Sequence, residues 1–156
     1  MSRRKISENK KIIADPIYNS TLVSKIINKI MKSGKKSLAE KILYAAMKNI
    51  KEIKNQDPIQ ILKKSVENIT PKIEMKTRRI GGATYQIPCE ISEKRGKSIA
   101  IKILVKSAKN RNEKTIISKL QNEIIDAYNN IGNSVKRKEE IHKMAEANKA
   151  FAMVKL

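Results

Sequence analysis

The most regular feature of the chain is a series of apolar residues spaced as on one face of a helix. These residues recur at intervals of three and four between positions 20 and 32, and Ser33-Gly34 is typical of a helix end. Ser37 and Glu40 form a capping-box pattern, which predicts a second helix running to about residue 54. The apolar stripes expected on these two helices are Leu22, Val23, Ile26, Ile27, Ile30 and Met31, then Leu38, Ile42, Leu43, Ala46, Met47, Ile50 and Ile53.

A third helix is predicted after Asp57-Pro58, where an N-cap residue precedes a first-turn proline, and it ends at Thr70-Pro71. Helical spacing returns over residues 114–131, which Gly132 is expected to close. The last helix is expected to start near Ser134 and to run to about Phe151. The apolar stripes of the third helix and of the helix over residues 114–131 are Ile59, Leu62, Val66 and Ile69, then Ile116, Ile117, Leu120, Ile124, Ala127, Tyr128 and Ile131.

The hydrophobic period changes to strict alternation over residues 72–91. Gly81-Gly82 separates two alternating segments and is typical of a tight hairpin turn. Pro88 cannot occupy a central strand, but a lone two-stranded ribbon has only edge strands and tolerates it. We therefore expect a β-hairpin arm that protrudes from a helical body. The alternating residues are Ile73, Met75 and Thr77 before the turn, and Tyr85, Ile87, Cys89 and Ile91 after it.

Residues 92–109 leave two interpretations open. Alternation and β-branching over 99–105 favour a strand, whereas Ile99, Ile103 and Lys106 would stack on one face of a helix. The 156 residues suggest a single domain, residues 1–156, with an aliphatic core, since aromatic residues make up only 3%. The fold class is thus mainly α, with a basic N-terminal extension, read as an extended arm over residues 1–19, and the β-hairpin arm.

Charge points to the class of partner. Lys and Arg number 35 against 15 Asp and Glu, a formal net charge of +20. Such a chain repels itself unless a polyanion neutralises it, which favours nucleic acid and predicts binding that weakens as salt rises. A single cysteine, Cys89, excludes an intrachain disulfide and a Cys-rich zinc site, and we expect no metal and no cofactor. No apolar run is long enough for a membrane span, and no secretory signal begins the chain.

Several basic clusters are candidates for phosphate binding. Lys136-Arg137-Lys138 is expected in the first turn of the last helix, where the macrodipole is positive, so free backbone N–H groups and three cations would together form a phosphate site. The alternative is compensation by Glu139 and Glu140. On the arm, Tyr85 suits stacking on a base and packing on the ribbon equally well. The RNA-binding candidates are Arg3, Arg4, Lys5, Lys10, Lys11, Lys35, Lys36, Lys76, Arg78, Arg79, Tyr85, Lys94, Arg95, Lys136, Arg137, Lys138 and Lys143.

Signals of catalysis are weak. His142 is the single histidine, and no cysteine or second histidine accompanies it as a metal ligand. No phosphate-binding loop, dinucleotide fingerprint or nucleophile elbow occurs. We therefore expect no enzymatic activity.

Three motifs, in order, resemble the small-subunit ribosomal protein S-seven family. They are Ser20-Thr21-Leu22-Val23-Ser24-Lys25-Ile26-Ile27 with Gly34-Lys35-Lys36, Ile42-Leu43 and Ala46; the arm Arg78-Arg79-Ile80-Gly81-Gly82-Ala83-Thr84-Tyr85-Gln86-Ile87-Pro88; and Met144-Ala145-Glu146-Ala147-Asn148-Lys149-Ala150-Phe151-Ala152. The resemblance implies six helices and the β-arm, which would make residues 92–109 helical. It also implies that the family meets RNA at Lys35, Lys36, Lys76, Arg78, Arg79, Lys94, Arg95, Lys136, Arg137, Lys138 and Lys143.

The same resemblance implies a role in translation. Members bind small-subunit (16S-type) rRNA directly and organise the 3′ major domain that forms the subunit's head. They lie at the subunit interface near the exit-site tRNA and the mRNA path, beside a platform protein of the S-eleven type. An architectural DNA-binding protein with a β-arm is the alternative, but an apolar wedge expected at the arm's tip is replaced by Gly81-Gly82.

Two departures from the family pattern stand out. Met153-Val154-Lys155-Leu156 replaces an aromatic-basic tail, and Ile103 replaces a common tryptophan. The start of the chain, with Asp15-Pro16-Ile17-Tyr18, looks most like plastid-encoded members. Because the match begins at the first residues and leaves no room for a transit peptide, we expect an organelle-encoded protein of the plastid (chloroplast) ribosome, with the bacterial cytoplasm as the alternative.

Overall fold

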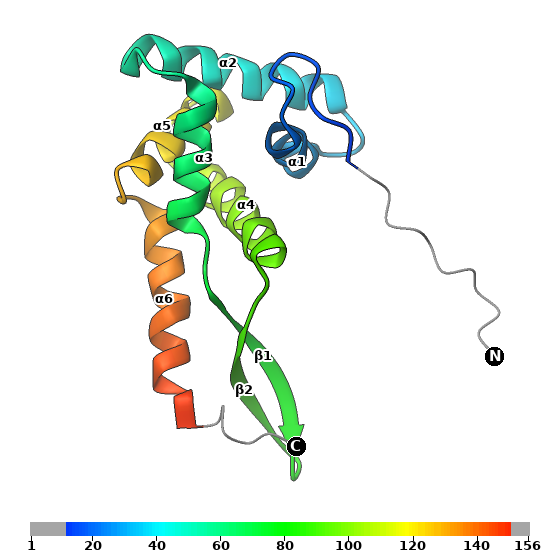
Figure 1. Cartoon of the computed structure of the whole chain (residues 1–156), viewed down its shortest axis with the longest axis vertical. Helices are drawn as coiled ribbons and strands as arrows, with labels where there is room; N and C mark the ends of the chain where they lie inside the picture. The colour runs from blue at the N-terminus through cyan, green and yellow to red at the C-terminus, as the bar shows by residue number, and fades with distance from the viewer. Residues whose placement is uncertain (1–11, 151–156) are drawn as a thin grey trace, which may run out of the picture.

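The structure is a computed structural model that describes residues 12–150. These residues form six helices and one antiparallel hairpin, so the mainly α fold with a β-arm is confirmed. The hairpin projects away from the helical body, and α6 extends beside it (Figure 1). The elements are α1 (Thr21–Ile30), α2 (Lys36–Lys54), α3 (Pro58–Ile69), β1 (Ile73–Ile80), β2 (Ala83–Glu90), α4 (Glu93–Lys109), α5 (Ile116–Tyr128) and α6 (Asn133–Ala147).

The core is aliphatic, as its composition predicted. Helix α5 packs against α2, α3, α4 and α6, while α1 packs against α2 and α4. Tyr18, Tyr44 and Tyr128 are only partly buried at its margin. The largest fully buried apolar side chains are Ile26, Ile27, Leu43, Met47, Ile50, Ile61, Leu62, Ile69, Leu104, Leu120 and Ile124.

Residues 15–20 do not continue the extended arm expected over residues 1–19. The Asp15 carboxylate accepts hydrogen bonds from the N–H groups of Ile17 and Tyr18, at 3.2 and 3.0 Å, and so closes a turn. Its other oxygen accepts a hydrogen bond of 2.6 Å from the Tyr44 hydroxyl on α2. Burial and then this bond raise the pKa of Tyr44. The turn is therefore anchored to α2, and residues 1–11 lie outside the described part.

Helix α2 begins two residues earlier than the capping-box pattern predicted, so that prediction is wrong. Lys35 is the N-cap residue, no side chain caps this end, and Lys36 pairs with Glu40 at 3.5 Å. Gly34 has a φ of 74°, and this left-handed turn directs the chain into the helix before Ser37 is reached. Leu38 and Ile53, expected in the core stripe, are 53% and 57% exposed because they lie in the first and last turns of a long helix.

Helix α3 has the predicted start and end. The Asp57 carboxylate accepts a hydrogen bond from the Ile59 N–H at 3.0 Å, Pro58 occupies the first turn, and Thr70 follows the last residue. The hairpin pairs Ile73 with Glu90 at its base and Ile80 with Ala83 at its tip. Gly81 and Gly82 have φ values of 56° and 88°, the positive angles that a tight two-residue hairpin turn requires.

Residues 93–109 are helical, so the interpretation implied by the family resemblance is confirmed. Helix α4 leaves the arm and returns to the core, where Ala100, Leu104 and Ala108 are buried. Near its start, Gly96 approaches the joint between α3 and β1: an added Cβ would lie 3.0 Å from the Thr70 methyl and 3.1 Å from the Pro71 carbonyl. This close contact fixes the base of the arm against α4.

The end of α5 differs from the prediction. The helix stops at Tyr128, and Asn130, with a φ of 59°, takes the left-handed position expected for Gly132. The Asn130 and Ile131 N–H groups bond to the carbonyls of Ala127 and Asp126, which is the Schellman arrangement. Ile131 is consequently 64% exposed rather than part of the core stripe. Gly132 instead caps α6, which ends at Ala147, short of the predicted Phe151.

The junction of α4, α5 and α6 is held by a buried carboxylate. Glu123 on α5 is fully buried and accepts from the Ser134 N–H, at 2.9 Å, and from the Ser134 hydroxyl. Its second oxygen pairs with Arg111 at 2.8 Å. Arg111 also bonds Glu113 and Asp126, at 2.8 and 2.7 Å. One guanidinium therefore joins the loop after α4 to α5, and Glu123 joins α5 to α6.

We expect Glu123→Gln to lower the free energy of unfolding by about 1–3 kcal/mol, since it removes a buried charge-assisted partner of Arg111 while Glu113 and Asp126 remain. Chemical denaturation measures the change. Glu139→Gln, an exposed residue on α6, is the matched control and should be within about 0.5 kcal/mol of the wild type. Equal unfolding free energies for the two variants would contradict the role given to Glu123.

Acid should weaken the same junction. Hydrogen bonds from Arg111 and then Asn122 lower the pKa of Glu113 from 4.5 to about 2. Because the unfolded chain takes up a proton before the folded one does, this stabilisation is complete above about pH 4.5 and is lost toward pH 2. We expect the free energy of unfolding of Glu113→Gln to fall less steeply over this range than that of the wild type. Parallel curves would show that Glu113 does not contribute.

Candidate nucleic-acid interface

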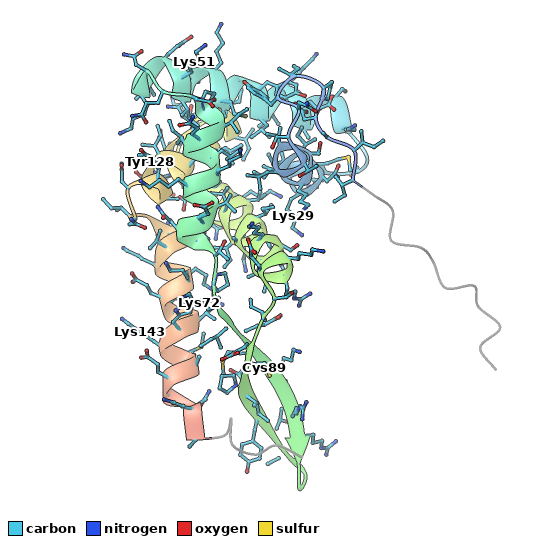
Figure 2. All side chains as sticks on the ribbon, viewed as in Figure 1. Lys29, Lys51, Lys72, Cys89, Tyr128 and Lys143 are labelled. Atoms are coloured by element: carbon cyan, nitrogen blue, oxygen red, sulfur yellow. The ribbon has the colours of Figure 1, made fainter. Side chains whose placement is uncertain are left out.

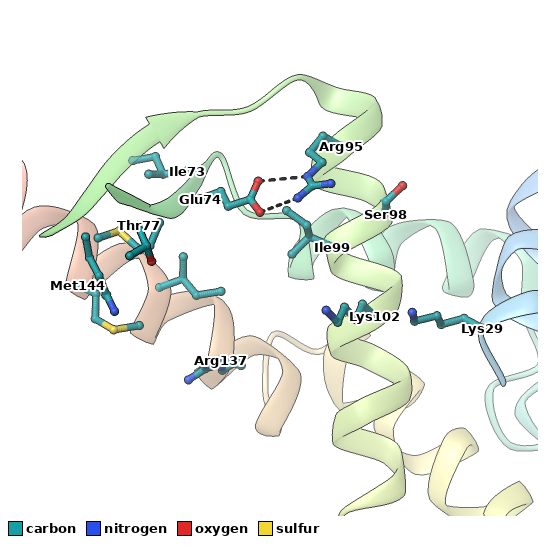
Figure 3. A pocket seen from close by; sticks show the side chains of 13 residues that line it. Lys29, Ile73, Glu74, Thr77, Arg95, Ser98, Ile99, Lys102, Arg137 and Met144 are labelled. Atoms are coloured by element: carbon teal, nitrogen blue, oxygen red, sulfur yellow. Dashed lines mark hydrogen bonds and ion pairs between the residues drawn. The ribbon is translucent and has the colours of Figure 1, made fainter. Parts of the chain in front are cut away.

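A groove lies between the base of the arm and helices α1, α4 and α6. Its volume is about 580 Å³, and 13 residues line it. Four of them are cations that come from three helices: Lys29 on α1, Arg95 and Lys102 on α4, and Arg137 on α6. Figure 3 shows Lys29 and Lys102 extending toward the side of the groove where Arg137 lies. Two of these cations are paired with acids, Arg95 with Glu74 and Arg137 with Glu140, while no acidic partner is seen for Lys29 or Lys102 among the described residues. Cations brought together from separate helices suit a phosphate backbone.

Helical spacing explains how each helix contributes to the groove. On α4, the groove is lined by Arg95, then Ser98 and Ile99, then Lys102, at steps of three or four residues, so that they lie on one face of the helix. On α6, Arg137, Ile141 and Met144 line it with the same spacing. The groove is thus lined by apolar and polar side chains in similar measure, with cations from α1, α4 and α6 among them.

Glu74 is the one carboxylate among the described residues that line the groove. Its two oxygens accept hydrogen bonds from the Nε and Nη2 of Arg95, at 3.1 and 2.7 Å (Figure 3). The Arg95 hydrogen bonds keep the pKa of Glu74 below its ordinary value, so the carboxylate stays charged. This ion pair joins β1 to the first turn of α4.

The predicted arm cations are exposed along β1. Lys76, Arg78 and Arg79 all face solvent, and the Arg79 Nε donates to the Gly82 carbonyl at 3.3 Å. Tyr85 lies directly opposite Arg78 in the ladder and is half-buried. The arm therefore carries exposed cations toward its tip, with Lys76 and Arg78 on one face of the ribbon and Arg79 on the other.

The phosphate site predicted at the start of α6 stays a prediction, and an internal acid already takes one of its donors. Glu123 takes the Ser134 N–H, one of the groups that a phosphate would use. Arg137 pairs with Glu140 at 2.6 Å, as the alternative interpretation held, and Lys138 donates to the Asn68 carbonyl at 2.6 Å. Lys136 and Lys143 remain exposed on the helix.

The other predicted cations do not all meet at the groove. Lys94 is exposed in the first turn of α4, beside Arg95. Lys35 lines a separate hollow with Leu38 and Ile116, and Lys36 is exposed next to it. Arg3, Arg4, Lys5, Lys10 and Lys11 lie outside the described residues, as does Phe151.

Sequence reasoning missed two groove residues, Lys29 and Lys102. Lys29 lies between stripe residues of a short helix, and Lys102 lies in the segment whose helix or strand character was left open. The spacing from Arg95 to Lys102 was the available signal, but it counts only once that segment is known to be helical.

The His142 side chain takes a hydrogen-bonded role. Its Nε2 accepts from the Lys72 N–H at 3.3 Å and so links α6 to the start of the arm. Within residues 12–150, no three His, Cys, Asp or Glu side chains are arranged as metal ligands. Among the helices described, none combines the length and the apolar character that crossing a bilayer requires.

Comparison with known proteins gives a consistent result over nearly the full chain. The family model described as "Ribosomal protein S7p/S5e" matches residues 2–149. The chain is 55% identical over 155 residues to small ribosomal subunit protein uS7c of Euglena gracilis, covering 99% of both chains. It is 54% identical over 150 residues to small ribosomal subunit protein uS7 of Mycoplasma capricolum, covering 96% of this chain and 97% of that one.

The uS7c protein of Ostreococcus tauri is 51% identical over 152 residues, with 97% of each chain covered. Plastid and bacterial relatives are thus similar to this chain to nearly the same degree. The helical body, the β-arm and the basic groove of the structure agree with this similarity. The chain therefore belongs to the ribosomal protein S7p/S5e family, as a structural and non-enzymatic component of the small ribosomal subunit.

Proposed function

We propose that the chain, acting as a single domain, binds small-subunit (16S-type) rRNA directly through the groove and through the arm cations Lys76, Arg78 and Arg79. The observation that carries this proposal is that Lys29, Arg95, Lys102 and Arg137 line one groove. Three separate helices fix the spacing of these charges, so the protein presents a rigid pattern rather than a diffuse positive surface. A folded RNA whose phosphates match that pattern is bound at several points at once.

The assembly role follows from binding at several points. A protein that binds separated RNA segments fixes the angle between them. We infer that this chain organises the 3′ major domain in this way, the domain that forms the head of the subunit. The family resemblance of the arm and of the last helix supports a position at the subunit interface near the exit-site tRNA and the mRNA path. It also supports contact with a platform protein of the S-eleven type.

We infer a plastid ribosome as the site of action, with a bacterial ribosome as the alternative. The 55% identity to the Euglena protein favours the plastid, and the 54% identity to the Mycoplasma protein supports the alternative. The N-terminal cations Arg3, Arg4, Lys5, Lys10 and Lys11 remain candidates for RNA contact on the strength of their charge alone.

Replacing Lys29 and Lys102 together by alanine tests the groove. We expect weaker binding to a 3′ major-domain transcript, with the salt-dependence slope reduced by about 0.7–0.9 for each phosphate that the variant no longer binds. Filter binding across a salt series measures both quantities. Both side chains are exposed, so thermal melting should stay close to that of the wild type.

The matched control is Lys48→Ala with Lys51→Ala, which removes the same charge from exposed positions on α2. Figure 2 places Lys51 at the end of the molecule away from the arm. Equally weakened binding by the two double variants would show that total charge, rather than the groove, determines binding. Equal affinity of the wild type for duplex DNA and for the transcript would favour an architectural DNA-binding protein instead.

The arm is tested by Arg78→Ala with Arg79→Ala. We expect weaker rRNA binding or slower head assembly, because both guanidinium groups are exposed and available to phosphates. The melting temperature should stay within a few degrees of the wild-type value, since surface substitutions cost about 0.5 kcal/mol or less. A loss of stability that accounts for the loss of binding would assign these residues to the fold.

A further inference from the structure

The presence of Glu74 in the groove is at odds with simple electrostatics. A carboxylate there repels RNA phosphates, yet it stands among Arg95, Lys102 and the cations of the arm. If attraction alone decided binding, a neutral residue would serve better. The geometry around Glu74 indicates what the charge contributes.

The pair that Glu74 makes with Arg95 is bidentate. The Nε–Oε2 and Nη2–Oε1 distances are 3.1 and 2.7 Å, so the guanidinium plane is fixed by two parallel hydrogen bonds. The Glu74 side chain is 25% exposed and the Arg95 side chain 60% exposed. The carboxylate is therefore the shielded partner, and the guanidinium is the exposed one.

The fork leaves part of Arg95 for a ligand. Glu74 occupies the edge formed by Nε and Nη2, and the described residues give Nη1 no hydrogen-bond acceptor. An arginine has five N–H donors in a planar arrangement, so the remaining donors point in a direction that Glu74 sets. A phosphate that binds Arg95 must approach along that direction.

The same ion pair also orients the arm. Glu74 is the second residue of β1, and Arg95 lies in the first turn of α4, directly before Gly96, which contacts Pro71. On the other side, the Lys72 N–H bonds His142 of α6. The base of the arm is thus held between α4 and α6, with the Glu74–Arg95 pair as its ionic contact.

We propose that Glu74 is a positioning residue that gives the groove its selectivity for folded rRNA over other polyanions. Glu74 orients the free edge of the Arg95 guanidinium and fixes the angle of the arm against α4. Its charge also repels any phosphate placed differently from those of the matching RNA. Selectivity here is a difference between two affinities, and a repulsive group increases that difference. This inference rests on the proposed function, because it concerns the same groove and the same RNA.

The two possible roles of Glu74 predict opposite results for Glu74→Gln. The substitution keeps the shape of the side chain and adds one unit to the chain's formal net charge of +20. If Glu74 only repels RNA, the variant binds the 3′ major-domain transcript and polyuridylate more tightly, to similar extents. If it positions Arg95, the variant binds polyuridylate more tightly but the transcript more weakly, and we expect the selectivity ratio, the dissociation constant for polyuridylate divided by that for the transcript, to fall about tenfold.

Glu90→Gln is the matched control. Glu90 is exposed at the base of the same hairpin, pairs with Ile73 in the ladder, and lines a hollow other than the groove. Its loss changes the net charge equally, so both RNAs should bind slightly more tightly and their ratio should stay unchanged. A fall in the ratio as large as that of Glu74→Gln would overturn the proposal.

Arg95→Lys gives a second measurement that keeps the charge and removes the fork. We expect it to lower the selectivity ratio about as much as Glu74→Gln, and the double variant to lower it no further, because both changes break one pair. Additive effects of the two substitutions would overturn the proposal. A wild-type chain without preference for the transcript would overturn the proposed function first, and that result is distinguishable because it needs no variant.

Discussion

The placement of α6 depends on one buried carboxylate. Glu123 satisfies the start of α6 through Ser134 and holds the Arg111 guanidinium that ties the loop after α4 to α5. Without this contact, the first turn of α6 would have a buried N–H group without an acceptor, which costs stability where α6 joins α5. Because α6 supplies Arg137 and the contact with the start of the arm, the groove depends on a group that does not line it.

Acidic and basic residues have separate tasks in this chain. Several of the few acids are internal or paired: Asp15 closes a turn, Asp57 caps α3, and Glu113, Glu123 and Asp126 surround Arg111. Most lysines are exposed and lack an acidic partner among the described residues. The fold uses its carboxylates to fix geometry, which leaves the surplus of positive charge at the surface where a phosphate backbone can reach it.

Local signals predicted those elements whose ends are determined locally. Asp57-Pro58 and Gly81-Gly82 carry their own geometric requirement, so the start of α3 and the turn of the arm were predictable. The end of α5 was not, because Asn130 and Gly132 both tolerate a positive φ and only the tertiary position of Glu123 directs Gly132 to the start of α6. Leu38 and Ile53 fit the stripe of α2, but they lie in its first and last turns and are largely exposed.

The groove was less predictable than the fold. Arg95 and Arg137 were singled out as basic clusters along the chain, whereas Lys29 and Lys102 are isolated in sequence and meet them only in three dimensions. A run of cations can be read from the sequence, but cations that come together from three helices can be found only in the folded structure. Lys138 shows the opposite case, since it belongs to a basic run and yet bonds the end of α3.

The two-stranded arm has a consequence for the protein before it meets RNA. Within the described residues β1 pairs only with β2, so both strands leave one row of backbone groups open. Such edges invite pairing between copies and thus aggregation. Lys76, Arg78 and Arg79 on β1 repel a second copy, and Pro88 removes a donor from β2. The charges that suit the arm to RNA therefore also disfavour edge-to-edge pairing of two arms.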